Sequence, residues 1–343
     1  MIQKIAFIDH HFHQFTKSSH FFQELLREKF EVDVFFAAVD IHNMVVEIAD
    51  AGYDAVVCWQ TEYLCPFFVR RGISTIGIPM WDGVCTLSDA YWHSLTGTKF
   101  ICFSSDLYER ITSCGHTALH VQYMKDPANF PQQTDFDELR VVFWQRLPEH
   151  GLNGQFVRNV IQDAGSIHIH NAPDCSDPSE HPINFGSVSF FDPTRNHYAK
   201  ALDRSNVLIC PRFTEGIGMA MIEGLTRGMC VIANDEGTHT DYITNWVDGV
   251  FVDYRKAIMG SVDLPLSPEL ARELGENARV RAFEAYDAWK QSESNIQTFV
   301  ADQKTSCEAE QLRTMSDYEI ALFVSRAAVN VHEYIANFQQ LES

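Results

Sequence analysis

The sequence predicts an α/β protein with two parallel sheets. Short apolar segments of strand length alternate with helical stretches along most of the chain. Such alternation is typical of strands joined by helical crossovers, and therefore of parallel sheets. At 343 residues the chain exceeds what one hydrophobic core usually organises, so we expect two domains.

The predicted strands fall into two series, separated by a polar stretch. The first series is 4–8, 32–37, 55–59, 75–78, 100–103 and 119–123, and the second is 140–144, 166–170, 188–190, 207–210, 230–233 and 250–252. Between them, 125–138 contains prolines, glutamines and acids without apolar periodicity, which indicates an interdomain linker. We therefore expect an N-terminal domain over 1–130 and a C-terminal domain over 138–290.

Two long helical stretches follow the last predicted strand, at 268–286 and 317–341. The second carries apolar side chains at helical spacing, namely Tyr318, Ile320, Leu322, Phe323, Ala327, Val331 and Ile335. Such a face predicts a helix that docks on the protein or joins two copies as a homodimer. We assign 291–343 to a C-terminal helical segment.

The composition excludes several classes of protein. A formal net charge of −20 argues against nucleic-acid binding, which needs faces rich in Lys and Arg. No apolar run approaches the roughly 20 residues of a membrane helix, and residues 1–4 do not lead into a signal peptide. The cysteines occur singly, without a CxxC pair, as expected for reduced thiols. We therefore expect a cytoplasmic protein without a membrane span.

The most informative stretch is 208–254. An apolar strand ends at Pro211, a polar turn follows, and Gly216 and Gly218 precede a helix that begins near Met219. A glycine-bearing loop before a helix presents backbone N–H groups and a positive dipole end to an anion. The pattern therefore predicts a ligand site at the carboxyl edge of the second sheet.

Two carboxylates, Glu215 and Glu223, accompany this loop at a spacing of eight. Eight helical residues exceed two full turns by only about 80°, so both side chains are expected to point toward one cleft. Two glutamates alone also fit a first-turn dipole charge and a solvated helix residue. The adjoining strand and the two glycines favour the ligand site.

The stretch 208–254 resembles the donor-site signature of retaining GT-B glycosyltransferases of family 4, a Glu-x7-Glu motif. The matching residues are Pro211, Glu215, Gly216, Gly218, Glu223, Gly228, Val231, Ile232, Ala233, Asp235 and Gly237. Upstream, 142–151 resembles the family's G-R-L-x-x-x-K-G strand and loop, and 274–279 resembles its L-G-x-x-A-R helix. The resemblance implies two Rossmann-like domains facing each other across a cleft, with C-terminal helices that cross back to the N-terminal domain.

By this resemblance the chain is a hexosyltransferase-type glycosyltransferase with a nucleotide-diphosphate sugar as donor. Glu223 would bind the ribose hydroxyls, Glu215 would hold the donor sugar, and Arg146 would neutralise the diphosphate leaving group. The loop backbone would contact sugar or diphosphate at Gly216, Ile217, Gly218 and Met219. Family habit implies retention of anomeric configuration by front-face displacement, with the leaving phosphate as the base. It also implies a glycan or lipid-linked glycan acceptor, in bacterial surface polysaccharide biosynthesis. No metal or other cofactor is expected.

The chain departs from the family pattern at three places. His150 stands near the position of the family's second phosphate cation, a lysine. Because a histidine ordinarily titrates near pH 6.5, our hypothesis is that donor affinity falls between pH 6 and 8. Residues 9–14 replace the family's glycine-rich first loop, and Asp82 is expected in place of a sugar-facing histidine.

Two motifs invite a metal interpretation. His10, His11 and His13 could ligate a metal, but no acidic or cysteine partner stands at ligand spacing, so loop or substrate-facing histidines are favoured. Asp135 and Asp137 form a DxD pattern before a strand, in the predicted linker, and are interpreted as solvated charge.

Two alternatives to a glycosyltransferase stay open at this point. A UDP-sugar 2-epimerase shares the two-domain architecture, and the histidine-rich loop offers it acid–base groups. A non-catalytic nucleotide-sugar-binding subunit would fit the altered His150 and the missing glycine loop. Fold similarity alone does not separate these functions.

Overall fold

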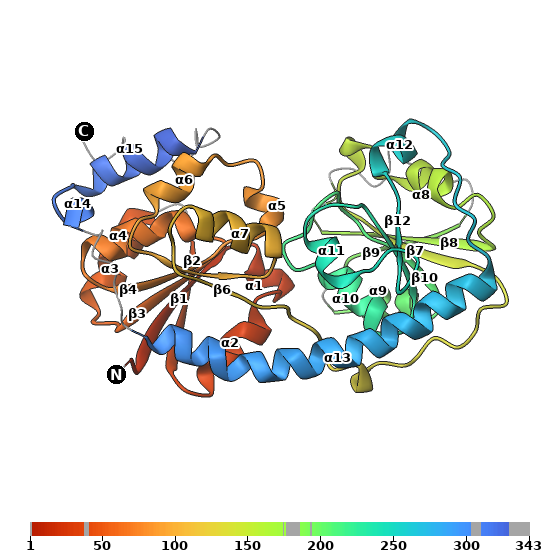
Figure 1. Ribbon diagram of the computed structural model, residues 1–343, viewed down its shortest axis with the longest axis horizontal. Coiled ribbons are helices and arrows are strands. Elements are labelled where there is room, and N and C mark those ends of the chain that lie inside the picture. Colours follow the sequence, from red (N-terminus) through yellow and green to blue (C-terminus); the bar gives the residue numbers. More distant parts are fainter. Residues whose placement is uncertain are drawn as a thin grey trace. The chain divides into compact units, whose positions relative to one another are not determined.

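The protein divides into two compact units, each built on its own sheet (Figure 1). The computed structural model describes residues 2–37, 41–173, 175, 186–192, 194–302 and 310–328. The N-terminal unit is Met1–Val121 with Lys290–Ser343, and the C-terminal unit is Gln122–Trp289. The second division lies inside helix α13 (Pro268–Ala301), which continues well past the predicted end at residue 286.

The N-terminal unit holds a six-stranded parallel sheet in the order β2-β1-β3-β4-β5-β6. Its strands are β1 (Lys4–His10), β2 (Glu31–Ala37), β3 (Ala55–Trp59), β4 (Ser74–Ile78), β5 (Lys99–Cys102) and β6 (Ala118–His120). Its helices are α1 (His13–Thr16), α2 (His20–Arg27), α3 (Ile41–Asp50), η1 (Glu62–Leu64), α4 (Cys65–Arg70), α5 (Trp81–Val84), α6 (Asp89–Ser94), α7 (Ser105–Ser113), α14 (Glu310–Arg313) and α15 (Asp317–Ala327). All six predicted strands of this unit are confirmed.

Both faces of this sheet are buried, which explains why its strands are almost continuously apolar. On one face α2 supplies Phe22, whose ring lies 5.3 Å from that of Trp59 and 6.1 Å from that of Phe103. On the other face, side chains of α3, α4, α6 and α7 form one core with α14 and α15. In that core Ile320 and Val324 are buried.

The described C-terminal segment packs on the N-terminal unit through polar contacts as well. Arg71 Nη2 lies 2.7 Å from Asp317 Oδ2, and Gln297 Nε2 donates to the Leu25 carbonyl at 2.9 Å. The predicted helix over 317–341 is present as α15 up to Ala327. Its continuation, with Val331 and Ile335, lies outside the described residues. None of the helices in the described ranges has the length and hydropathy that a membrane span requires.

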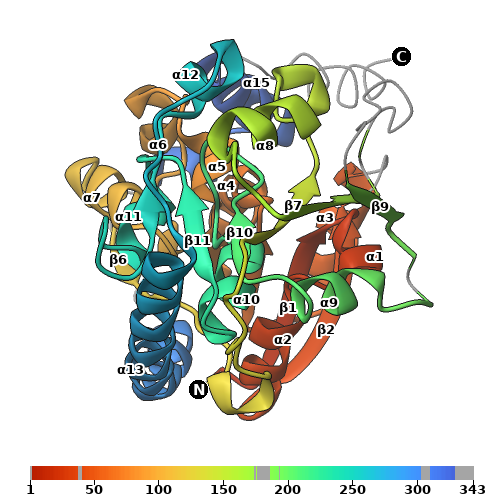
Figure 2. The ribbon, with the colours of Figure 1, turned by 90° about the vertical axis from the view of Figure 1, so that its right-hand side faces the viewer.

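The C-terminal unit holds a second six-stranded parallel sheet, in the order β12-β11-β10-β7-β8-β9. Figure 2 shows β11, β10, β7 and β9 of this sheet from left to right. Its strands are β7 (Arg140–Gln145), β8 (Ser166–Asn171), β9 (Ser187–Phe190), β10 (Val207–Ile209), β11 (Cys230–Ala233) and β12 (Val250–Phe251). Its helices are η2 (Pro127–Asn129), η3 (Pro148–His150), α8 (Gly154–Val160), α9 (His197–Leu202), α10 (Met219–Thr226), α11 (Thr238–Tyr242) and α12 (Tyr254–Met259), with most of α13. Numbered from β7, the order is that of a dinucleotide-binding Rossmann sheet.

Strand alternation assigns the two faces of this sheet. Phe143, Ile169 and Ile209 point into a core with α8, α12 and the start of α13. Their neighbours along the strands point to the opposite face, where α9, α10 and α11 lie (Figure 1). That opposite face and the adjoining strand ends carry the predicted donor-site residues.

The segment that we predict as a linker packs with the C-terminal unit, which begins at Gln122. Tyr242 Oη donates to the Tyr123 carbonyl at 2.9 Å, and Arg279 Nη2 donates to the Pro127 carbonyl at 3.0 Å. Backbone groups without strand partners are thus satisfied by side chains of α11 and α13.

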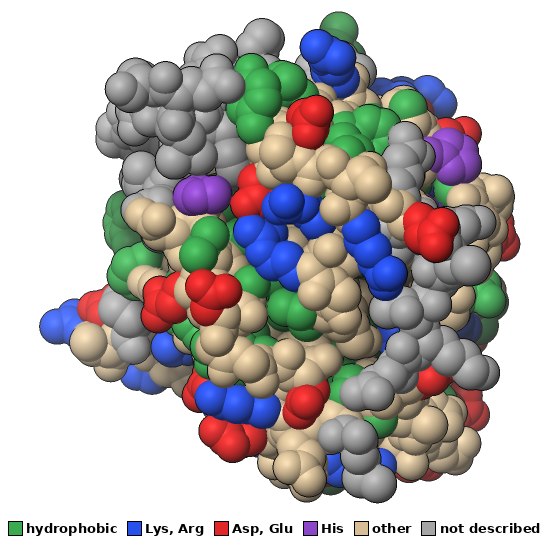
Figure 3. Space-filling model, turned by 90° about the vertical axis from the view of Figure 1, so that its left-hand side faces the viewer, with side chains coloured by type: hydrophobic (Ala, Val, Ile, Leu, Met, Phe, Trp, Pro, Cys, Tyr) green, Lys and Arg blue, Asp and Glu red, His purple; other side chains and the backbone are tan. Residues whose placement is uncertain are grey.

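The surface carries charges of both signs despite the net charge of −20. On the face drawn in Figure 3, Lys and Arg side chains gather near the middle, with Asp and Glu around them. A strongly acidic chain therefore still presents local cationic areas.

Candidate functional site

The candidate site begins at the switch point of the second sheet. Strands β7 and β10 are neighbours there, and the chain leaves them toward opposite ends of the sheet. Crevices at such points, beyond the carboxyl ends of the strands, are where open α/β sheets bind ligands. Arg146 directly follows β7, and Glu215 lies in the loop that follows β10. The sequence-predicted residues therefore flank this point.

The loop after β10 leads into α10 through a glycine that no other residue replaces easily. Gly218 is the N-cap, with φ 78° and ψ 51°, and no side chain caps the helix. A Cβ on Gly218 would lie 2.8 Å from Met221 Cε in a left-handed conformation. The first N–H groups of α10 are thus available to an anion, as the sequence predicts for Gly216, Ile217, Gly218 and Met219.

Glu215 lies in a loop that hydrogen bonds hold in place. The residue is only 8% exposed. The Thr238 hydroxyl donates to the Glu215 carbonyl, and Asn234 Nδ2 donates to the Phe213 carbonyl at 3.2 Å. Burial, and then the Glu215 charge, hold the pKa of the Cys210 thiol well above its usual range. The structure therefore places the Glu215 carboxyl group beside the end of β10.

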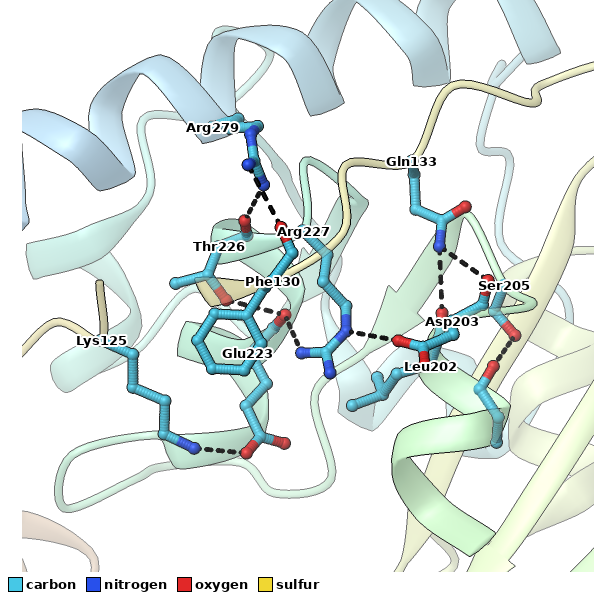
Figure 4. A network of polar contacts seen from close by, with 11 residues as sticks. Lys125, Phe130, Gln133, Leu202, Asp203, Ser205, Glu223, Thr226, Arg227 and Arg279 are labelled. Atoms are coloured by element: carbon cyan, nitrogen blue, oxygen red, sulfur yellow. Dashed lines mark hydrogen bonds and ion pairs between the residues drawn. The ribbon is translucent and has the colours of Figure 1, made fainter. Parts of the chain in front are cut away.

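Glu223 lies in α10 and forms an ion pair with Lys125, which sequence analysis does not single out (Figure 4). The Glu223 side chain is 20% exposed and that of Lys125 is 22% exposed. Burial and the Glu223 charge raise the pKa of Tyr123 to about 12. Burial and the same charge also raise the pKa of Tyr198. Two neutral phenols and one ammonium group thus surround this carboxylate.

A row of side chains crosses the sheet next to the two glutamates. Strand pairing aligns Trp144 with His170 and His170 with Ser189. Tyr198 of α9 covers the row, with its ring 4.4 Å from Trp144 and 5.2 Å from His170. Burial, and then the charges of His168 and His197, lower the pKa of His170 to about 4, so its imidazole is neutral at pH 7.

Several polar atoms of this row are buried and find no hydrogen-bond partner among the described residues. They are Trp144 Nε1, His170 Nε2 and the Tyr198 hydroxyl. Because buried polar atoms are nearly always paired, such a cluster indicates a place that water or ligand atoms complete. The row lies beside Glu223, whose charge acts on Tyr198.

The other residues that the sequence predicts for the site lie outside the loop between β10 and α10. His150 ends η3 and is exposed, and its proposed role with the diphosphate stays a prediction. Asp82 lies in the first turn of α5, in the N-terminal unit, and its role also stays a prediction. Asp135 of the DxD pattern pairs with Arg140, with Oδ2 and Nη2 3.1 Å apart.

The histidine-rich loop after β1 contains a self-contained network. Asp9 is fully buried and lies 2.5 Å from His13 Nδ1. Its carboxylate also accepts hydrogen bonds from the Ser19 hydroxyl, from Gln23 Nε2 at 3.4 Å and from the His10 backbone N–H at 2.8 Å. In the described ranges, no three His, Cys, Asp or Glu side chains are grouped to hold a metal.

A comparison with known families matches part of the chain. Residues 187–281 match the family model described as glycosyl transferases group 1. This stretch of the chain therefore resembles that family. The matched stretch contains α9, β10, the loop with Glu215 and helix α10 with Glu223.

Solved structures show that the chain has the GT-B fold. Sucrose-phosphate synthase from Thermosynechococcus elongatus superposes with a TM-score of 0.63 at 14% identity, covering 88% of this chain and 100% of that chain. Anabaena HepE in complex with UDP gives 0.61 at 13% identity, over 88% and 100%. The lipopolysaccharide outer core galactosyltransferase WaaB gives 0.60 at 13%, over the same shares. No curated protein sequence matches the chain.

Sequence reasoning misses two parts of the candidate site. Lys125 pairs with Glu223 across 98 residues, so no local motif reports it. The polar row of Trp144, His170 and Tyr198 is assembled by strand register and by the packing of α9. Trp144 and His170 end the predicted strands 140–144 and 166–170 with polar ring nitrogens, and this is a signal that could have pointed to the row.

Proposed function

We propose that the chain is a glycosyltransferase that transfers a sugar from a nucleotide-diphosphate sugar to a glycan acceptor, with retention, in bacterial surface glycan biosynthesis. The observation that carries the donor class is the uncapped α10 N-terminus at the switch point, with Glu223 on the same helix. A helix start binds the diphosphate, and an ionised carboxylate accepts hydrogen bonds from ribose hydroxyls. Solved HepE structures hold UDP and UDP-glucose, which makes UDP the first nucleotide to test.

The residues divide the reaction between them. Arg146 and the α10 backbone stabilise the charge that develops on the leaving diphosphate, and Glu215 holds the donor sugar. The acceptor oxygen bonds to the anomeric carbon while the bond from that carbon to the β-phosphate oxygen breaks. The electron pair leaves with the nucleoside diphosphate, whose phosphate oxygen takes the acceptor proton.

We further propose that transfer needs no divalent metal. The positive charge of Arg146, the helix start and the His150 side chain would counter the diphosphate instead. Asp82 is proposed to face the donor sugar, and the C-terminal helix to join two copies. Transfer that persists in excess EDTA supports the metal-independent proposal.

The test is nucleotide-dependent thermal stability. We expect UDP, or one of GDP, TDP, CMP and ATP at millimolar concentration, to raise the melting temperature by a few degrees. A ligand at about 100 times its Kd stabilises by about 2.7 kcal/mol. The shift should vanish in Glu223→Ala and persist in Glu276→Gln, an exposed glutamate of α13.

Two outcomes contradict the proposal. If no nucleotide shifts the wild type, or if only NAD does, the donor site is not a nucleotide-sugar site. If a nucleotide shifts Glu223→Ala as much as the wild type, the ligand lies elsewhere. Product analysis without acceptor separates transfer from 2-epimerisation, because an epimerase changes the sugar nucleotide alone.

A further inference from the structure

Lys125 is held against Glu223 by the architecture around it. Its ammonium group binds Glu223 Oε1 and lies 5.9 Å from the centre of the Phe130 ring. The guanidinium of Arg227 lies 4.7 Å from the same ring centre. Figure 4 shows the Phe130 ring beside both cationic side chains. The aromatic face therefore supports the ammonium group next to the carboxylate.

The backbone on both sides of Lys125 is also fixed to the C-terminal unit. Before it, Gln122 Nε2 donates to the Asp241 carbonyl at 2.9 Å, and the Tyr123 carbonyl accepts from Tyr242. After it, Arg279 donates to the Phe130 carbonyl at 3.3 Å. A lysine on an exposed, unanchored segment loses conformational entropy when it forms an ion pair. Because these contacts already hold the backbone around Lys125, its ion pair with Glu223 costs less of that entropy.

Glu223 keeps capacity for further hydrogen bonds. Lys125 engages Oε1, and among the described residues no hydrogen bond reaches Oε2. Each carboxylate oxygen has two acceptor sites, so Oε1 can still accept one more bond and Oε2 can accept two. The side chain is one-fifth exposed, and the unpartnered Tyr198 hydroxyl is close enough to sense its charge. The carboxylate is therefore oriented but not saturated.

We propose that Lys125 is a positioning residue that makes the donor site prefer ribose to 2′-deoxyribose nucleotides. This inference rests on the proposed function, in which Glu223 binds the ribose. A ribose diol presents two neighbouring O–H donors, and a carboxylate accepts both only when its plane faces the sugar edge. Lys125 fixes that plane by holding one oxygen. A 2′-deoxyribose offers one of the two donors and gains less from the arrangement.

The test compares UDP with 2′-deoxy-UDP, by calorimetry, on the full-length protein. If GDP or ADP is the nucleotide that stabilises the wild type, its own 2′-deoxy form replaces the uridine pair. The wild type should bind the ribose form at least about tenfold more tightly, the value of one charge-assisted hydrogen bond. Lys125→Met should weaken ribose-nucleotide binding about tenfold while changing 2′-deoxy-nucleotide binding less than threefold. Lys125→Arg, which keeps the cation, should retain most of the preference.

The control is Lys256→Met in the same unit. Lys256 is exposed, and its Nζ lies 3.4 Å from Asp253 Oδ2. This variant removes an equal charge and an ion pair, and it should bind both nucleotides as the wild type does. A double variant, Glu223→Gln with Lys125→Met, should show the preference of Glu223→Gln alone, because Lys125 acts through that carboxylate.

Three outcomes overturn the inference while leaving the proposed function intact. If Lys125→Met binds the ribose form as tightly as the wild type, or more tightly, the lysine is a bystander or a competitor for Glu223. An equal loss for both nucleotides indicates a general effect of charge or folding. If the wild type binds the ribose and 2′-deoxyribose nucleotides equally, there is no preference for Lys125 to set. If the wild type binds no nucleotide at all, the proposed function fails, and this inference fails with it.

Discussion

The carboxyl edges of the two sheets each hold a carboxylate, and the two differ in how completely it is satisfied. In the N-terminal unit, Asp9 is fully buried and bound by His13, Ser19 and Gln23. In the C-terminal unit, Glu223 is partly exposed and engaged through one oxygen by Lys125. The N-terminal edge, which we call closed, satisfies its carboxylate within the protein, whereas the C-terminal edge, which we call open, leaves its carboxylate with spare hydrogen-bonding capacity.

The difference indicates which edge awaits a ligand. A buried network whose members are all paired contributes stability and leaves nothing for a substrate. Beside Glu223, by contrast, Trp144 and His170 have buried nitrogens without hydrogen-bond partners in the described chain. Polar groups that the protein itself does not satisfy are expected where a ligand or bound water completes them.

The largest expected effect is a contrast between the two carboxylates. Asp9→Asn should lower the free energy of unfolding by about 3 kcal/mol, because it breaks a buried charged network. Glu223→Gln should cost less than about 1 kcal/mol, since its ion pair is partly exposed, yet it should weaken nucleotide binding at least about tenfold. Urea unfolding and calorimetry of both variants measure this. Equal losses of stability would remove the distinction between the edges.

Acid should destabilise the C-terminal unit more than the N-terminal unit. Burial lowers the pKa of His170 and of His239 to about 4, so both stay neutral in the folded state. The unfolded chain binds their protons below about pH 6.5, so stability falls as pH drops from 6.5 toward 4. At pH 5 each of these two histidines lowers the free energy of unfolding by about 2 kcal/mol. Burial, and then the charges of His11 and His13, also lower the pKa of His10 in the N-terminal unit.

Hydrogen exchange between pH 7.5 and 5 distinguishes the two units peptide by peptide. Protection factors, which compare each exchange rate with the intrinsic rate at the same pH, should fall at low pH first in β8 and α11. His239→Gln should flatten part of this pH dependence. Protection factors that fall equally in the N-terminal sheet would contradict the assignment of the acid-sensitive groups.

The smallest expected effect is a difference in stability between two glycine substitutions, one at the start of α10 and one in α5. Gly218→Ala places a side chain at φ 78° and should cost about 1–2 kcal/mol, together with weaker nucleotide binding. Gly83→Ala, in α5, meets no atom within 4 Å and should stabilise by up to about 1 kcal/mol. Melting temperatures of the two variants provide the comparison, and a tolerated Gly218→Ala would argue against a constrained start of α10.

The strand pattern was readable because parallel strands buried on both faces are short apolar runs. Residues 55–59 and 230–233 match β3 and β11 residue for residue. Helix ends were harder to predict. Helix α13 continues to Ala301 because its last turns pack in the N-terminal unit, where the Phe299 carbonyl accepts from Lys99 Nζ at 2.8 Å. That contact spans 200 residues and leaves no local pattern.

The sequence by itself determined the α/β class, the twelve strands, and the strand, glycine loop and helix that carry Glu215 and Glu223. These features depend on neighbours within about ten residues, whose periodicity and turn chemistry are visible in the chain. Only the tertiary structure decided that Lys125 reaches Glu223, that Asp9 is enclosed by His13, Ser19 and Gln23, and that unpaired polar atoms gather beside α10. Those contacts arise from sheet order and helix packing, which bring together side chains that the sequence keeps far apart.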